Sequence, residues 1–404
     1  YFRQFFSFQF TWEQRKLGSI GSTYTGLSGK TKEDFGHGEA KYITYLNVFQ
    51  NTISNITMTD KVEIDPTQNE VKYGDVLFTT SSETPEEVGM SSVWLGDTPN
   101  IYLNSFCFGF RPNQKIDSYF LGYSLRAPYM RDKIKILAQG ISRYNISKNK
   151  VMELEISLPN NEEQKLLGTF LQRIDLIITL HQRKLEHLNL KKKALLQKLF
   201  PKNGERYPEL RFPGFTDAWE QCKLGDFAEI VRGASPRPIS DPKWFDNDSN
   251  VGWLRIADVT AQDGRIRYLE QKISELGQEK TRVIKTPHLL LSIAATVGKP
   301  VINYIPTGVH DGFLIFLNPK FNILYAFWWL EMFREKWNKY GQPGSQVNLN
   351  SDLVKNQVIN IPNEKEQEKI SSFLESLDKI ITLHQCKLEH LQLQKKALLQ
   401  QMFV

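Results

Sequence analysis

The chain has 404 residues, and 51 Lys and Arg against 45 Asp and Glu give a net charge of +6. This length exceeds one ordinary core and predicts two or three domains. No apolar run reaches the ~18–20 residues of a membrane span, and the aromatic first ten residues do not resemble a signal peptide, so we expect a cytoplasmic protein. The three dispersed cysteines, Cys107, Cys222 and Cys386, exclude a disulfide framework and a cysteine zinc site.

The predicted segments follow in chain order. Residues 1–11 are an aromatic lead that receives no role, and residues 12–158 form a first domain. A long helix occupies residues 159–203, and residues 204–361 hold a linker and a second domain. A second long helix ends the chain at residues 362–404.

Both domains combine short strands with helices. Runs rich in β-branched and aromatic residues predict strands at Val76–Thr80, Leu289–Ile293 and Phe313–Leu317, between Gly, Pro and Asn turns. Helices are expected at Ser118–Lys133 and at Tyr325–Lys339. The fold class is therefore α+β, with two domains of about 150 residues.

The strongest signal is an internal repeat. Residues 159–200 and 362–403 align without a gap at an offset of 203, with 26 identities in 42 positions. The motif WEQRKLG at 12–18 recurs as WEQCKLG at 219–225, whereas YITYLNV at 42–48 faces the different WLRIADV at 253–259. We infer two domains of one fold with different surfaces, each followed by nearly the same helix.

Each long helix carries an apolar seam with alternating spacings of four and three residues, which is typical of coiled coils. The seam is interrupted at the same His and Lys in both copies, His181 and Lys192, then His384 and Lys395. The two seams are expected to cover each other, and an antiparallel pair would give the chain an approximate twofold axis. The seam residues are Leu167, Leu171, Ile174, Ile178, Leu185, Leu188, Ile370, Leu374, Leu377, Ile381, Leu388 and Leu391.

Motifs of catalysis are missing from the sequence. Gly29-Lys30-Thr31 resembles the end of a phosphate-binding loop, but Tyr24 stands where that loop needs glycine. Neither a Pro-Pro dipeptide of an amino-methyltransferase nor a Pro-Asp dipeptide of a nuclease core occurs. The histidine pairs of the long helices lie six residues apart and face different directions, so no metal site is expected.

Polar turns that differ between the halves are the candidate DNA-binding residues. Arg and Gln read guanine and adenine in the major groove, whereas Lys, Ser and Thr suit phosphates. In one shared position the first half has Arg143 and the second has Gln346, so the hydrogen-bonding code differs. The candidates are Lys30, Lys32, Thr79, Thr80, Ser81, Ser82, Ser142, Arg143, Tyr144, Arg232, Arg237, Thr296, Lys299, His310, Ser345 and Gln346.

These patterns together resemble the specificity subunits of type I restriction–modification systems (HsdS). The resemblance rests on WEQRKLG, on the turns SRYNI and SQVNL, and on the ITLHQRKLEHL helix, and it covers residues 12–403. It implies two target-recognition domains that each read half of a bipartite, asymmetric DNA site, with an antiparallel helix pair as spacer. One departure is that the lead RFPGFTDA before Trp219 has no counterpart before Trp12.

The resemblance also implies partners and no catalysis by this chain. Two methyltransferase subunits would dock on the helices and methylate adenine with S-adenosylmethionine, and two ATP- and Mg²⁺-dependent subunits would translocate and cleave unmodified DNA. The chain itself would need no cofactor. Two alternatives stay open from the residues alone: a scaffold whose domains bind peptides, and a stand-alone nuclease or methyltransferase.

Overall fold

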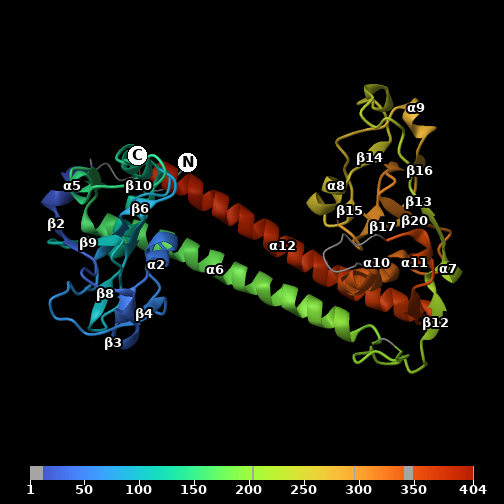
Figure 1. The fold of residues 1–404 in the computed structure, drawn as a ribbon, viewed down its shortest axis with the longest axis horizontal. Helices are drawn as coiled ribbons and strands as arrows, with labels where there is room; N and C mark the ends of the chain where they lie inside the picture. Colours follow the sequence, from blue (N-terminus) through green and yellow to red (C-terminus); the bar gives the residue numbers. More distant parts are fainter. Residues whose placement is uncertain (1–11, 203, 295, 341–348, 404) are drawn as a thin grey trace. The chain divides into compact units, whose positions relative to one another are not determined.

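The computed structural model describes residues 12–202, 204–294, 296–340 and 349–403. Contacts divide the chain into two compact units, Tyr1–Arg183 with Cys386–Val404 as unit 1, and Lys184–Gln385 as unit 2. Each unit therefore holds one domain, the adjoining part of its own long helix and the far end of the other one (Figure 1). This organisation confirms the predicted α+β fold with two similar domains and two long helices.

Unit 1 is built on a four-stranded sheet in the order β2-β9-β5-β7 and a three-stranded sheet in the order β4-β3-β8. Its strands are β1 Glu13–Lys16, β2 Gly21–Thr25, β3 Phe35–Ile43, β4 Thr59–Val62, β5 Val76–Thr79, β6 Ser81–Ser82, β7 Ser91–Val93, β8 Ile101–Leu103, β9 Cys107–Pro112, β10 Tyr144–Asn145 and β11 Glu155–Leu158. Its short helices are α2 Tyr45–Gln50, α3 Ser118–Arg126, α4 Pro128–Ile136 and α5 Lys148–Met152, with 3-10 turns at Leu17–Ser19 and Lys32–Asp34.

Unit 2 has a five-stranded sheet in the order β13-β20-β17-β18-β15 and a three-stranded sheet in the order β14-β19-β16. Its strands are β12 Glu220–Lys223, β13 Glu229–Arg232, β14 Gly252–Leu254, β15 Arg265–Ile266, β16 Arg282–Ile284, β17 Leu289–Ser292, β18 Pro300–Asn303, β19 Thr307–Val309, β20 Phe313–Leu317 and β21 Val358–Ile361. Its short helices are α7 Leu224–Phe227, α8 Ile256–Ala261, α9 Glu275–Gln278, α10 Ile323–Phe333 and α11 Ser351–Lys355, with 3-10 turns at Pro242–Trp244 and Arg334–Tyr340.

The predicted strands are confirmed to within one residue, but the two predicted helices are wrong in their extent. Ser118–Lys133 is interrupted after α3, because Pro128 holds Ala127 in an extended conformation and starts α4. The other predicted helix begins at Ile323 and changes to a 3-10 turn at Arg334. Both α3 and α10 begin at a side-chain cap, Asp117 and Asn322.

The long helices are α6, Asn161–Lys198, and α12, Glu364–Met402. In unit 1, Leu167 and Leu171 at the start of α6 pack with Phe403 at the end of α12. In unit 2, Leu199 near the end of α6 packs with Ile370 and Leu374 near the start of α12. Within each unit the two helices therefore run antiparallel, as the seam predicts.

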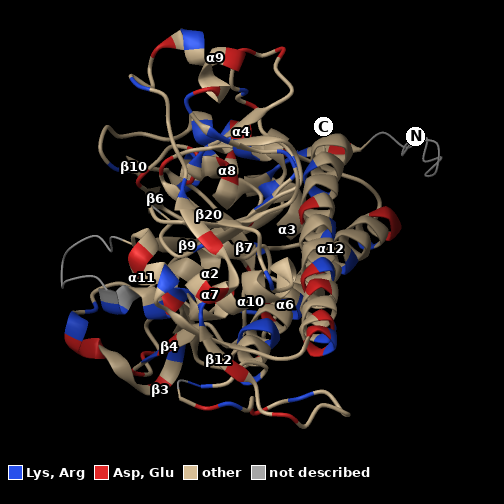
Figure 2. Cartoon of the chain, turned by 90° about the vertical axis from the view of Figure 1, so that its right-hand side faces the viewer, with Lys and Arg blue, Asp and Glu red and all other residues tan. Residues whose placement is uncertain are grey.

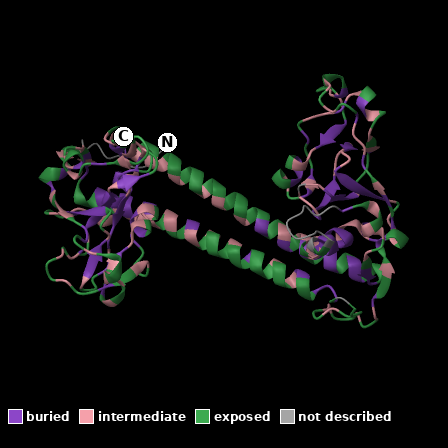
Figure 3. Cartoon of the chain, viewed as in Figure 1, coloured by how far each residue is buried: buried purple, intermediate pink, exposed green. Residues whose placement is uncertain are grey.

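Every residue of the predicted seam is buried or half-buried. Figure 3 shows both helices exposed over most of their surface, and Figure 2 shows both acidic and basic residues along α12. The buried seam residues are Leu167, Leu171, Ile178, Leu188, Ile370, Leu374, Leu377 and Ile381, and the half-buried ones are Ile174, Leu185, Leu388 and Leu391.

The lysines that interrupt the seam pair with aspartates of the other helix. In unit 2, Lys192 of α6 binds Asp378 of α12, and its ammonium lies 4.9 Å from the Trp328 ring centre. In unit 1, Lys395 of α12 binds Asp175 of α6 and lies 5.3 Å from the Tyr123 ring. Because Asp175 and Asp378 are repeat equivalents, as are the two lysines, the two units contain the same polar contact. A half-buried ion pair at one level of an apolar seam fixes the register of the two helices.

In both units a glutamine hydrogen bond and a group of three aromatic rings attach the domain to the long helix that follows it. The amide of Gln164 accepts from the Asp117 backbone N–H at 3.0 Å, and that of Gln367 accepts from Asn322 at 2.9 Å. An aromatic trio lies beside each contact: Trp12, Phe120 and Phe403 in unit 1, and Trp219, Tyr325 and Phe200 in unit 2. The repeated sequence thus produces the same set of contacts around the helix ends in both units. We call the long helices and these contacts the frame.

The lead before Trp219 explains one difference between the frames. Arg211 of this lead donates from Nε and Nη2 to the two carboxylate oxygens of Glu366, both at 2.8 Å. The equivalent Glu163 in unit 1 instead accepts from the Trp12 indole at 3.2 Å. The lead in the second half therefore neutralises a carboxylate that α12 buries.

Candidate nucleic-acid interface

Two equivalent turns lie at the strand ends of the domains. In unit 1 the turn 104–106 joins β8 to β9, and in unit 2 the turn 310–312 joins β19 to β20. Each turn packs on the glycine that directly follows β2 in unit 1 and β13 in unit 2. A Cβ at Gly26 would lie 2.1 Å from the Asn104 carbonyl oxygen, and one at Gly233 would lie 2.2 Å from that of His310. The frame fixes both turns against the sheet by the same close approach.

In unit 1 this turn brings together an arginine and an aromatic ring. The Arg143 guanidinium lies 5.6 Å from the Phe106 ring centre, and the Thr80 hydroxyl donates to the Phe106 carbonyl at 2.8 Å. Tyr144 is held beside them because β10 pairs with β6. Ile141, in the same loop as Arg143, is 96% exposed. This surface places the Arg143 cation beside the exposed side chains of Phe106 and Ile141, which suits contact with a phosphate and with apolar groups of sugars or base edges.

In unit 2 the turn brings two arginines to one aspartate. Arg232 Nε donates to the Asp311 carbonyl at 2.6 Å, and Arg237 Nη2 donates to Asp311 Oδ2 at 2.6 Å. The Ser235 hydroxyl donates to Asp311 Oδ1 at 2.7 Å. We call Arg232, Ser235, Arg237, His310 and Asp311 the Asp311 cluster. It presents two exposed guanidinium groups from one anchored point.

Electrostatics keep the centre of this cluster in a defined protonation state. Burial lowers the pKa of His310, and the charges of Arg237 and Arg232 lower it further against the opposing effect of Asp311. The His310 Nδ1 accepts from the Gly312 backbone N–H at 2.8 Å, so Nε2 carries the proton of the neutral ring. Burial opposes ionisation of Asp311, but the Ser235 hydrogen bond and the neighbouring cations leave its pKa lowered. The cluster is thus an anion between two arginines and a neutral imidazole.

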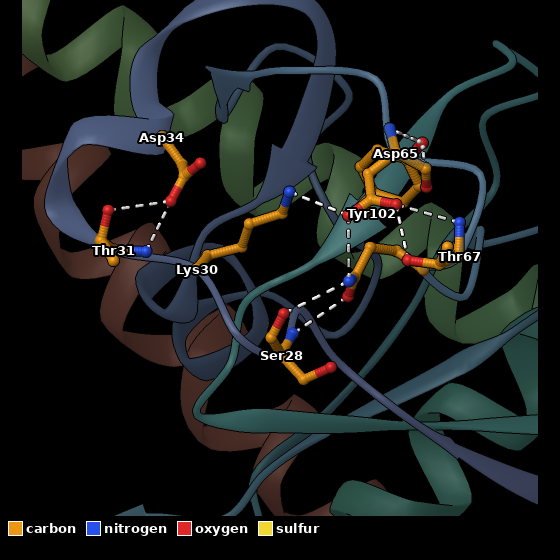
Figure 4. Close-up of polar contacts among 8 residues, drawn as sticks. Ser28, Lys30, Thr31, Asp34, Asp65, Thr67 and Tyr102 are labelled. Atoms are coloured by element: carbon orange, nitrogen blue, oxygen red, sulfur yellow. Dashed lines mark hydrogen bonds and ion pairs between the residues drawn. The ribbon is translucent and has the colours of Figure 1, made fainter.

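Lys30 stands in the place of Arg237 in the repeat, 207 residues earlier, and has a different environment. Its ammonium binds Asp65 Oδ2 at 2.9 Å, and only 14% of its side chain is exposed. Figure 4 shows this ion pair within a network that includes Thr67 and Ser28. Hydrogen bonds from Thr67 and from Lys30 lower the pKa of Asp65. Lys30 therefore holds loops of unit 1 together, and its charge is already compensated.

Several predicted DNA contacts are buried, which corrects their placement on the surface. Thr79 accepts from the Met90 backbone N–H, and Ser82 donates to Glu87. Lys299 binds Asp263 at 2.6 Å and Glu331 at 3.3 Å. Ser81 lies in β6 and is buried as well. These four side chains are buried, the three of unit 1 in or beside paired strands and Lys299 between two carboxylates.

The other candidates remain predictions. Lys32 and Ser142 are exposed, and Thr296 donates its hydroxyl to Ser292 at 3.1 Å. Ser345 and Gln346 lie outside the described residues.

Sequence reasoning missed Phe106, Ile141 and Asp311. The signal for Asp311 was the His-Asp-Gly turn directly before the strand Phe313–Leu317, since such turns commonly carry side chains at strand ends. Phe106 and Ile141 had no such signal, because apolar residues in a sequence are expected in a core.

The described residues contain no group of three His, Cys, Asp or Glu side chains that could hold a metal ion. Within the same ranges, no helix is long and apolar enough to span a membrane.

Comparison with known proteins shows which family has this architecture. The sequence profile of the type I restriction modification DNA specificity domain matches residues 10–190 and 216–393. A protein of Methanocaldococcus jannaschii named as the MjaX specificity subunit of a type I restriction enzyme is 24% identical over 403 residues, which is 96% of this chain and 92% of that protein. The MjaVIII specificity subunit of the same organism is 23% identical over 304 residues, 71% of this chain and 69% of its own length.

Solved structures show the same fold. The S subunit of a type I restriction–modification system from M. genitalium superposes with a TM-score of 0.61 at 14% identity, covering 98% of this chain and 97% of that one. A chain from a study of complex assembly and conformational transition of the type I R-M system also gives 0.61, at 17% identity and 97% coverage of both chains. With two profile matches on two units of one frame, this chain belongs to the family of type I restriction–modification specificity subunits.

Proposed function

We propose that this chain binds double-stranded DNA and that each domain reads one half of a bipartite, asymmetric target. The observation that carries this proposal is the pair of equivalent turns on one frame. The turn of unit 1 places Phe106 beside Arg143, whereas the turn of unit 2 gathers two arginines on Asp311. Equal frames with unequal contact chemistry are what two different half-sites require.

In this proposal partner subunits supply the chemistry. Two methyltransferase subunits use S-adenosylmethionine to methylate adenine in the recognised site, and two further subunits use ATP and Mg²⁺ to translocate and cleave unmodified DNA. The chain itself is non-catalytic and needs no cofactor.

Exposed apolar side chains of the long helices support two equal docking positions. Ile177 and Leu180 of α6 are exposed, and so are their repeat equivalents Ile380 and Leu383 of α12. Exposed apolar pairs on a helix are typical of contacts to another protein. One pair in each unit favours two copies of the same partner.

Methylation mapping tests the proposal. The chain is expressed with its methyltransferase partner in a host without other adenine methylation, and modified adenines are located in the genome. We expect one motif with two unlike halves and a fixed gap. A continuous motif, a symmetric motif or no motif would contradict the proposed function.

The spacer role of the helices has a separate test. Four residues inserted at equivalent levels of α6 and α12 add ~6 Å at 1.5 Å per residue. Because DNA rises ~3.4 Å per base pair, the gap of the mapped motif should grow by about one or two base pairs. Retention of the original gap would contradict the spacer role while leaving the two half-sites intact.

A further inference from the structure

The Asp311 cluster holds an exposed arginine in one orientation. The side chain of Arg237 is 70% exposed, and one of its five N–H donors binds Asp311 Oδ2. The other oxygen of Asp311 accepts from Ser235, whose own oxygen accepts from the Asp311 backbone N–H at 3.2 Å. The carboxylate is therefore anchored from both sides and offers the Arg237 guanidinium a hydrogen-bond acceptor at a defined position.

Stability does not explain this arrangement. An ion pair with so exposed a partner contributes little to folding, since water competes for both charges. Lys30, the equivalent of Arg237 in unit 1, instead pairs with Asp65 of another loop, and both side chains are largely buried, which is a structural role. The substitution of a buried lysine by an exposed arginine leaves unit 2 with four unused donors in a planar group.

The chemistry of the cluster favours a base edge over a phosphate. A guanidinium can give two parallel hydrogen bonds to O6 and N7 of guanine, and a carboxylate can accept from N4 of the paired cytosine. The negative charge of Asp311 repels phosphate oxygens. A phosphate contact by Arg237 is therefore weaker than the same contact by an arginine without a neighbouring carboxylate. An arginine held in one direction also loses less side-chain entropy on binding.

The surface beside the cluster is hollowed. His310 lines a cavity of about 540 Å³ together with Trp253, Phe245, Arg255 and Gln271. The Arg255 guanidinium is likewise held in place, because Asp258 accepts from Nε at 3.1 Å and from Nη2 at 3.0 Å. This concave surface meets the Asp311 cluster at His310, so it adds apolar walls and a further positioned guanidinium to the same face of unit 2.

We propose that Arg237, positioned by Asp311, reads the guanine of one G·C pair in the half-site of unit 2. This inference rests on the proposed function and adds to it a base identity and the residue that selects it. Asp311 acts as a positioning residue through Arg237.

Three variants of the full chain, each expressed with the methyltransferase partner, test the assignment. Arg237→Lys keeps the charge but replaces the planar guanidinium by a point-charge ammonium, Arg237→Gln removes the charge, and Asp311→Asn removes the carboxylate that pairs with the guanidinium. Arg334→Gln is the matched control, since Arg334 is a part-exposed arginine of unit 2 paired with Glu331 on a different element. Each complex selects its targets from duplexes randomised in the half-site, and thermal unfolding verifies that the variants fold.

Loss of the guanine preference at one position, on the order of 10- to 100-fold, is expected for Arg237→Gln, and a smaller loss at the same position is expected for Arg237→Lys, because an ammonium can still donate to O6 and N7. Asp311→Asn should give a partial loss at the same position, and Arg334→Gln should give none. The other positions and the other half-site should be unchanged in all variants.

A phosphate contact gives a different pattern and would overturn the assignment. In that case Arg237→Lys keeps the full preference, and Arg237→Gln weakens all sequences equally while the dependence of affinity on salt becomes shallower. An unchanged motif in both Arg237 variants would also overturn it. If the unmodified chain itself yields no bipartite motif, the proposed function fails first, and the two failures are thereby distinguished.

Discussion

Replacement of Arg211 by alanine should destabilise unit 2 strongly. The guanidinium gives two charge-assisted hydrogen bonds of 2.8 Å to Glu366, whose side chain is 1% exposed, while that of Arg211 is 15% exposed. Arg211→Ala therefore leaves a buried carboxylate without its counter-charge. Loss of one partner of a buried pair costs about 3–5 kcal/mol.

The expected change in melting temperature follows from the size of the unit. Unit 2 runs from Lys184 to Gln385, which is 385 − 184 + 1 = 202 residues. For this size each kcal/mol lowers the melting temperature by roughly 2–4 °C, so we expect a fall of roughly 10 °C. Six of the eight tryptophans belong to unit 2, so their fluorescence during heating chiefly reports this unit.

Two further variants define the cause. Lys198→Ala removes a lysine from the exposed pair with Glu209 in the same unit and should cost less than about 1 kcal/mol. Glu366→Gln added to Arg211→Ala removes the uncompensated charge and should recover much of the loss. The reasoning is refuted if Arg211→Ala shifts the transition by no more than the Lys198 control, or if the second substitution only adds to the damage.

Three other predictions concern the helix pair, the thiols and pH. Asp378→Lys places two lysines together in the seam and should lower the free energy of unfolding by about 1–2 kcal/mol. Lys192→Asp added to it should restore the melting temperature, whereas strictly additive losses would contradict a direct pair. Burial raises the pKa of Cys222 to about 12, so a thiol reagent at pH 8 should label the exposed Cys386 well before Cys222, as peptide mass mapping over time can show. Burial lowers the pKa of His310, so the unfolded chain binds that proton more tightly than the folded one. The stability of unit 2 should therefore decrease as the pH falls through about 6.5. In denaturant titrations at pH 7.5 and 5.5, His310→Gln should reduce this decrease, and an equal decrease in the variant would contradict the assignment.

The repeated frame could be predicted from the sequence because its signals are periodic. The seam spacing and the 203-residue offset depend on the sequence alone, and they correctly indicate two paired helices and two similar domains. The bonds of Lys192 and Lys395 could not be predicted in detail. Their partners lie on the other helix, and only the antiparallel register brings them together.

The candidate interface was less predictable, because a polar residue in or near a short turn can be buried as well as exposed. Thr79 and Lys299 have the residue types of phosphate contacts, yet strand pairing and two carboxylates turn them into internal contacts. Arg232, Arg237 and His310 were predicted separately. The residue that unites them, Asp311, belongs to a turn whose position depends on the sheet and on the close approach of Gly233.

The way each domain enters and leaves the frame has a consequence for exchange of specificity. Its first strand pairs with its last in an antiparallel ladder, Glu13 opposite Leu158 in unit 1 and Glu220 opposite Ile361 in unit 2. The two ends of a domain therefore emerge as neighbours at the foot of its helix. We expect a relative's domain to be exchangeable as one segment between these strands, provided that it keeps the side chains that contact the helices, such as Tyr123 and Trp328. Under the proposed function, exchange of a whole domain should therefore change one half of the target and leave the other half unchanged.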